Sequence, residues 1–258
     1  MISVHNLHKT YGSKAVLSRV TVSFPRQRLT SLIGPNGAGK TTLLMLLARL
    51  LEPDSGDIRL DGRSIASMAI GDYARRVATL RQSVEFNLRL TVDELVAFGR
   101  FPYSRGALTR EDRQAIDEAI GFLALEPLRH RYLDELSGGQ RQMAFLAMTV
   151  AQQTDYLLLD EPLNNLDMGH AVQIMRALRR LCDEFGRTVI LVVHDINFAA
   201  SYSDCIVAMK DGQVHCTGSV EAVVTEQQLH TLYGLEFEIT QSARGRLCNY
   251  FNPPGEQR

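Results

Sequence analysis

Residues 29–42 read LTSLIGPNGAGKTT, and this stretch decides how the chain around it is expected to fold. The apolar run Leu29–Ile33 predicts a short buried strand, and the segment from Gly34 to Thr41 satisfies the pattern GxxxxGK followed by Ser or Thr. Apolar residues then recur at helical spacing, at positions 43, 44, 46, 47 and 50. A glycine-rich turn between strand and helix lets backbone N–H groups converge on an anion, at which the positive helix end also points. The stretch therefore predicts a phosphate-binding loop for a nucleoside triphosphate.

The residue types in this loop fit that chemistry. Lys40 supplies a compact positive charge to the β- and γ-phosphates, and the hydroxyl of Thr41 is suited to ligate Mg²⁺. The nucleotide contacts expected from the loop are Gly34, Pro35, Asn36, Gly37, Ala38, Gly39, Lys40, Thr41 and Thr42.

A second apolar strand, Tyr156–Leu159, ends in two acidic residues. Successive side chains at the end of a strand point in opposite directions, so the two carboxylates can take different roles. Asp160 is suited to hold Mg²⁺ through its water shell, and Glu161 to act on the attacking water as a general base or by positioning it.

The remaining pattern predicts an α/β fold. Strands are expected at Ile2–Leu7, Ala15–Phe24, Asp57–Leu60 and Thr188–Val193, with a turn at Gly12 and helices at 169–185 and 221–233. Between about residues 90 and 150 the pattern is helical, with helix starts at Thr91 and Thr109. Continuous apolar strands alternating with helices predict a doubly wound parallel core, here interrupted by a helical insertion.

Composition limits the classes of function. The 258 residues carry a net charge of −1, which argues against nucleic acid as the main partner because such proteins usually carry a basic excess. The four cysteines form no CxxC pair and are expected to be free thiols in a reducing compartment. Neither a signal peptide nor an apolar run of about 20 residues is recognisable, so we expect a soluble cytoplasmic chain whose membrane partner provides any span.

The run Leu136–Gln140, LSGGQ, stands between the phosphate loop and the strand that ends in Asp160 and Glu161. By itself it could be a capping turn, with Ser137 as the helix cap. In this order it closely resembles the signature of ATP-binding-cassette (ABC) ATPases. Other motifs of that family occur in the expected order along the chain. Tyr11 matches the aromatic residue that stacks on adenine, and Gln82 matches the glutamine at the start of the helical insertion. Asn165–Asp167 matches the loop that crosses a dimer interface, and His194 matches the switch histidine at the γ-phosphate. Arg81 stands where the family usually has proline.

The resemblance implies a P-loop NTPase (RecA-like) core with an N-terminal antiparallel β-subdomain and an inserted α-helical signature subdomain. The whole chain, 1–258, would be one ATPase domain, with the core at 1–83 and 151–240, the helical subdomain at 84–150 and a C-terminal tail at 241–258. It also implies a head-to-tail homodimer that encloses ATP and Mg²⁺. Lys40, Gln82, Glu161 and His194 would be catalytic, and Thr41, Gln82 and Asp160 would serve the metal. The second subunit would bring Ser137, Gly138, Gly139 and Gln140 to the nucleotide.

Within the family, the segments 90–103, 161–167 and 194–197 look most like those of importers for iron–siderophore complexes, haem and cobalamin, with the iron–siderophore ATPases closest. This implies integral membrane permease subunits, a periplasmic or lipid-anchored siderophore-binding protein, and a place on the cytoplasmic face of the bacterial inner membrane. The loop expected at 101–106 could meet the permease. The alternatives are an importer ATPase for haem, cobalamin or another metal chelate, a soluble ABC ATPase outside transport, and a non-catalytic binding module, which Glu161 and His194 oppose.

Overall fold

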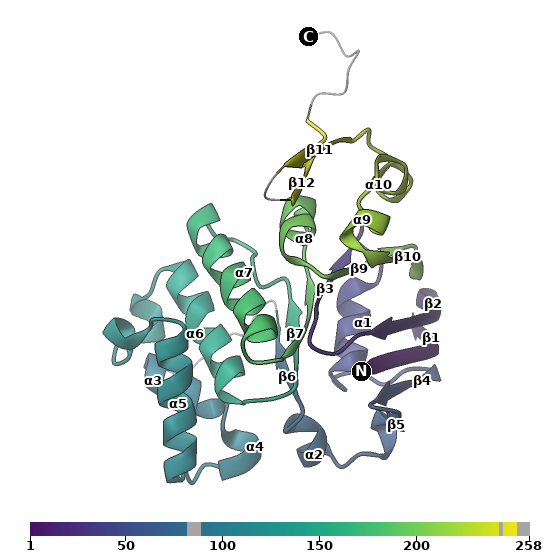
Figure 1. The fold of residues 1–258 in the computed structure, drawn as a ribbon. Helices are drawn as coiled ribbons and strands as arrows, with labels where there is room; N and C mark the ends of the chain where they lie inside the picture. The colour runs from purple at the N-terminus through teal and green to yellow at the C-terminus, as the bar shows by residue number, and fades with distance from the viewer. Residues whose placement is uncertain (82–88, 243–244, 252–258) are drawn as a thin grey trace. The chain divides into compact units, whose positions relative to one another are not determined.

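The structure, a computed structural model, describes residues 1–81, 89–242 and 245–251. It divides into two compact units, one formed by Met1–Ser67 with Ile190–Arg258 and the other by Met68–Val189 (Figure 1). The predicted position of Gln82 lies outside the described residues. The predicted boundaries at 83, 150 and 240 stay predictions.

The first unit begins with a four-stranded antiparallel sheet in the order β2-β1-β4-β5. Its strands are β1 Ile2–Tyr11, β2 Lys14–Phe24, β4 Ser55–Leu60 and β5 Arg63–Ser64. Val20, Val22 and Phe24 are buried and the residues between them are exposed, which gives one face to the core and one to solvent. The turn expected at Gly12 joins β1 to β2, and Tyr11 pairs with Lys14.

The phosphate loop follows β3 Leu29–Ile33, a strand buried at every residue. β3 runs parallel to β9 Cys205–Lys210, which pairs antiparallel with β10 Gln213–Ser219. The helix after the loop is α1 Lys40–Leu47, and it ends where Arg49 takes a left-handed conformation. β8 Thr188–Val192 enters this unit at Ile190 and leads to α8 Ile196–Tyr202.

The expected helix at 221–233 is wrong as a single element. The structure has α9 Val220–Val223 and α10 Glu226–Tyr233, separated by Val224 and Thr225. The Thr225 side chain accepts a hydrogen bond from the Gln228 backbone N–H at 3.2 Å and so starts a new helix. A hairpin of β11 Glu238–Ser242 and β12 Gly245–Asn249 follows.

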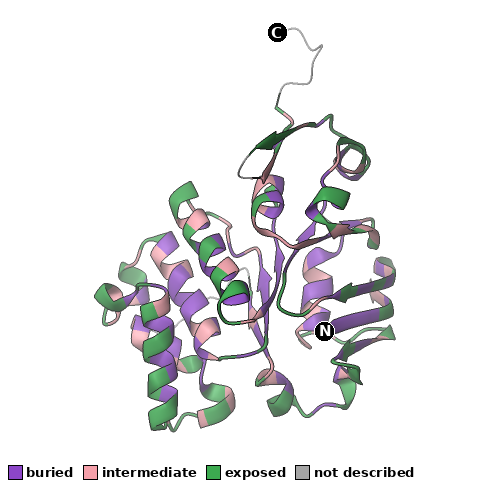
Figure 2. Cartoon of the chain, in the orientation of Figure 1, coloured by how far each residue is buried: buried purple, intermediate pink, exposed green. Residues whose placement is uncertain are grey.

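The second unit is mainly helical. β6 Val77–Leu80 and β7 Tyr156–Asp160 pair in parallel, and the helices are α2 Ile70–Ala74, α3 Val92–Phe98, α4 Phe101–Ser104, α5 Arg110–Phe122, α6 Gly138–Ala151 and α7 Met168–Asp183. The predicted starts at Thr91 and Thr109 are confirmed, because each hydroxyl belongs to a capping box. The loop expected at 101–106 begins instead with the short helix α4. In Figure 2, α5 and α7 each show one buried and one exposed side.

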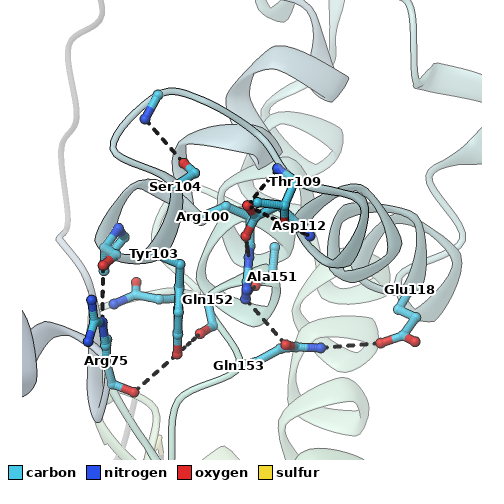
Figure 3. A network of polar contacts seen from close by, with 12 residues as sticks. Arg75, Arg100, Tyr103, Ser104, Thr109, Asp112, Glu118, Ala151, Gln152 and Gln153 are labelled. Atoms are coloured by element: carbon cyan, nitrogen blue, oxygen red, sulfur yellow. Dashed lines mark hydrogen bonds and ion pairs between the residues drawn. The ribbon is translucent and has the colours of Figure 1, made fainter.

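A buried ion pair anchors α4 in this unit (Figure 3). Arg100 donates to Asp112 at 2.8 Å, to the Ala151 carbonyl at 2.9 Å and to Gln153 at 3.2 Å. Its guanidinium also lies over the ring of Tyr103, 4.1 Å from the centroid. Burial would raise the pKa of Asp112, but hydrogen bonds from the Thr109 backbone and from Arg100 outweigh that effect, so the pKa is lowered and the carboxylate stays charged.

Among the described residues, no helix combines the length and the apolar character that crossing a membrane requires. The exposed large apolar side chains of the second unit include Ile70, Phe98, Phe101 and Met168.

Candidate nucleotide-binding site

The phosphate loop is closed by a contact with β9. Gly34 has φ +137°, and a Cβ on it would overlap the carbonyl oxygen of Met209. Gly39, with φ +95°, is the N-terminal cap residue of α1. Only glycine accommodates both the conformation and the close approach at position 34, so packing requires glycine there, independently of the phosphate contact that is predicted for it.

The Lys40 ammonium lies inside the loop. Its Nζ donates to the carbonyl oxygens of Gly34 at 2.7 Å and Pro35 at 3.0 Å, and the residue is buried. The Ala38 N–H donates to the Pro35 carbonyl at 3.2 Å, which closes the turn. The Lys40 ammonium, which is predicted to contact the β- and γ-phosphates, is thus held at the loop and does not extend into solvent.

Asp160 and Glu161 differ in surroundings as the strand end predicts. Asp160 is the last residue of β7 and is 4 % exposed, whereas Glu161 is half-buried and has φ +50°. A left-handed conformation is uncommon for glutamate and costs of order 1–3 kcal/mol, a strain that concentrates at functional sites. Asn164 holds the Glu161 side chain by donating its Nδ2 to Oε2, and its backbone N–H donates to the Glu161 carbonyl at 3.2 Å.

Residues 136–140 form the start of α6. The Ser137 hydroxyl accepts from the Gln140 N–H at 3.2 Å, and the Gln140 side chain accepts from the Ser137 N–H at 3.1 Å. This capping box confirms Ser137 as the cap. Ser137 and Gly138 are exposed, Gln140 is half-buried and Gly139 is buried.

The loop at 165–167 leads into α7. Asn165 has φ +59°, and Asp167 caps α7 by accepting from the His170 N–H at 2.9 Å. The pKa of Asp167 is lowered, first by this backbone hydrogen bond and then by one from the His170 side chain. The sequence assigned no role to Asn164, although it lies in the family-like segment 161–167, or to His170, which lies outside the quoted motifs; only the structure shows their contacts with Glu161 and Asp167.

Two further predicted residues lie in the first unit. Tyr11 ends β1 and is 49 % exposed, so its ring has a free face of the kind that stacks on a base. His194 is exposed directly after the buried end of β8, and the next residue, Asp195, caps α8 by accepting from the Asn197 N–H at 2.8 Å.

The first unit therefore carries the phosphate loop, Tyr11 and His194, and the second carries Asp160, Glu161, residues 136–140 and the 165–167 loop. A family model described as ABC transporter matches residues 17–164, which include the phosphate loop, the LSGGQ run and the Asp160–Glu161 pair.

The chain belongs to the ABC transporter family.

Two ABC relatives match over nearly their whole length. A petrobactin import ATP-binding protein of Bacillus subtilis is 47% identical over 98% of this chain and 100% of its own length. A second petrobactin import ATP-binding protein, from Bacillus anthracis, is 49% identical over 97% of this chain and 100% of its own length.

A solved ABC cassette, a dimer in a post-hydrolysis state with ADP and phosphate bound, is 30% identical, with a TM-score of 0.74. The likeness covers 85% of this chain and 99% of that one. The predicted P-loop NTPase fold is confirmed, and the chain is an ABC ATPase that binds and hydrolyses ATP.

Proposed function

We propose that this chain is the ATPase subunit of an ABC importer that takes up iron(III)–siderophore complexes. The observation that carries the proposal is the identity of 47% and 49% over nearly full length to two proteins named for petrobactin import. Cargo does not touch the ATPase in such systems, so the siderophore class follows from those relatives and petrobactin is the first cargo to test.

In the proposed mechanism each ATP lies between two copies of the chain. Lys40 and the loop glycines of one copy bind the phosphates, Tyr11 stacks on the adenine and His194 contacts the γ-phosphate. Ser137, Gly138 and Gly139 reach the γ-phosphate from the second copy, where a hydroxyl, backbone N–H groups and a helix N-terminus suit an anion. ATP favours the closed dimer because these contacts exist only on closure, and hydrolysis removes them.

Magnesium fits the donor set at the proposed metal position. The oxygen donors of Thr41, Gln82 and Asp160 are the ligand type that Mg²⁺ prefers, and Asp160 is buried at a strand end. When bound, the ion would neutralise charge that develops on the β- and γ-phosphates. Glu161 positions the attacking water or accepts its proton, and its hydrogen bond from Asn164 fixes where that carboxylate points.

The proposed partners are a second copy of the chain, integral membrane permease subunits and a periplasmic or lipid-anchored siderophore-binding protein. We place the permease contact on the apolar surface formed by Phe98, Phe101 and Tyr103, which are 46%, 59% and 37% exposed. With such partners the chain would act at the cytoplasmic face of the inner membrane.

Replacing Glu161 by Gln tests the catalytic assignment. The variant should bind ATP with unchanged affinity but lose hydrolysis by at least about 100-fold, because only the action on water is removed. ATP affinity and phosphate release are to be measured on the complex with its permease. Glu236→Gln is the control, since Glu236 is 70% exposed. Normal hydrolysis in Glu161→Gln would overturn the role of Glu161.

Uptake assays test the cargo. Cells that depend on this ATPase should accumulate ferric petrobactin, and cells with Glu161→Gln should not. Uptake of haem or cobalamin instead would favour the alternative importers. ATP hydrolysis without any permease in a pull-down would favour a soluble ABC ATPase.

A further inference from the structure

The imidazole ring of His170 lies against the glycine at the centre of the signature. A Cβ placed on Gly139 would overlap Cγ and Cδ2 of His170 and lie 2.6 Å from Nδ1. Gly139 is buried although Ser137 and Gly138 before it are exposed. The imidazole of His170, on α7, therefore occupies the space that a side chain at position 139, on α6, would need.

The same ring is fixed from the other side by the 165–167 loop. Asp167 Oδ2 lies 2.7 Å from His170 Nδ1, and Asp167 Oδ1 accepts from the His170 backbone N–H at 2.9 Å. Both carboxylate oxygens of Asp167 thus hold one residue, which sets the orientation of the imidazole as well as the start of α7.

We propose that His170 is a positioning residue that holds the signature turn, Ser137–Gln140, in register with the 165–167 loop. The inference rests on the proposed dimer, in which both segments face the second copy and its nucleotide. His170 does not touch ATP. His170 makes the signature turn and the 165–167 loop move as one body, so that dimer closure brings both to the partner together. Without the His170 side chain, each segment can adopt its own position.

The contact has an energetic consequence that is specific to dimer closure. Binding of ATP to one subunit depends on the phosphate loop of the first unit and should not depend on His170. Dimer formation and kcat depend on how well the signature meets the partner's nucleotide, so both should fall when the His170 side chain is removed. A merely structural residue would instead lower stability and all activities together.

The first experiment measures ATP-driven dimer formation by analytical ultracentrifugation in a Glu161→Gln background. His170→Ala should weaken the dimer about tenfold, a typical coupling for contacting residues, with unchanged ATP affinity of the monomer. In the otherwise native chain kcat should fall while KM for ATP stays within about twofold. His170→Asn, whose amide can still donate to Asp167, should restore part of the loss. The matched control is Gln173→Ala, at an exposed position of α7.

The second experiment tests the contact itself by a double-mutant cycle in urea unfolding. Gly139→Ala should be strongly destabilising in the native chain and much less so with His170→Ala, because the ring that obstructs the Cβ is gone. Additive effects would show that the ring does not obstruct position 139 and would overturn the inference, as would a dimer of native strength in His170→Ala.

The outcomes separate this inference from the proposed function. If the Glu161→Gln parent itself forms no dimer with ATP, the sandwich mechanism fails and the role of His170 falls with it. If the parent dimerises and His170→Ala dimerises equally well, only the role of His170 is overturned.

Discussion

At the scale of single residues, Gly34 joins the chemistry of the loop to the packing of the sheet. The φ of +137° and the overlap of an added Cβ with the Met209 carbonyl are two independent penalties. Strain in a sparsely populated backbone region costs of order 1–3 kcal/mol, and overpacking typically adds about 1–3 kcal/mol. The obstructing atom belongs to the backbone of β9, which cannot rotate away as a side chain can.

Gly34→Ala is therefore expected to lower the free energy of unfolding by about 3 kcal/mol or more, or to reduce the soluble fraction if the chain no longer folds. Urea unfolding, monitored by circular dichroism, measures the free energy of unfolding. Gly12→Ala is the matched control, because Gly12 also has a positive φ, +58°, but open space around it. Its cost should stay near 1–2 kcal/mol, roughly that of a left-handed residue alone. Equal losses in the two variants would refute the packing argument.

The sequence was sufficient for those site residues whose role lies in a local pattern. The strand, loop and helix around residues 34–41 and the cap at Ser137 are each encoded within a few consecutive residues, and both arrangements are confirmed. The left-handed conformation of Glu161, its hydrogen bond from Asn164 and the ring of His170 against Gly139 could not be predicted. These features depend on how the chain turns after β7 and on how two helices pack, which no spacing reveals. The catalytic and metal roles themselves stay predictions.

At the scale of elements, the Arg100–Asp112 pair decides where α4 lies. Both side chains are almost fully buried, with exposed fractions of 7% and 3%, and Arg100 lies over the Tyr103 ring (Figure 3). The Tyr103 hydroxyl donates to the Gln152 carbonyl at 3.1 Å. The guanidinium of Arg100 thus contacts α4, the start of α5 and the end of α6.

Arg100→Ala should lower the stability of the chain by about 3–5 kcal/mol, because Asp112 would remain buried without its partner. The control is Arg131→Ala, which removes an exposed pair with Glu135 and should cost less than about 1 kcal/mol. Urea unfolding measures both. Arg100→Lys should recover only part of the loss, since an ammonium cannot reproduce the fork. A full recovery with lysine would argue that charge alone matters at this position.

At this scale two helix starts were predicted correctly and one helix break was missed. Thr91 and Thr109 are each followed three residues later by an acid, the pattern of a capping box, and both cap helices. Between 221 and 233 the apolar residues stop at Val224 and resume at Leu229, because residues 225–228 are all polar. A second signal for the break was present as well, since Gln228 follows Thr225 by three residues, the spacing of a helix cap, and the expected single helix at 221–233 ignored both.

At the scale of the whole molecule, a substitution at Ser137 is expected to affect dimer assembly much more than folding of the subunit. Ser137 caps α6 and is exposed, so a change there should cost only about 1 kcal/mol, the usual value for a lost cap. In the proposed dimer the same position faces the γ-phosphate of the second copy. A long side chain at 137 would therefore leave each subunit folded while it blocks closure.

Ser137→Arg in a Glu161→Gln background should bind ATP as the parent does but elute as a monomer from a sizing column run with ATP and magnesium. Thr109→Ala supplies the control, because it removes an equivalent capping box at the start of α5 without altering the signature. That variant should lose comparable stability and still form the ATP-dependent dimer. If Ser137→Arg dimerises as well as Thr109→Ala, the signature does not lie at a subunit interface. If neither variant dimerises, the loss comes from weakened helices and not from a blocked nucleotide.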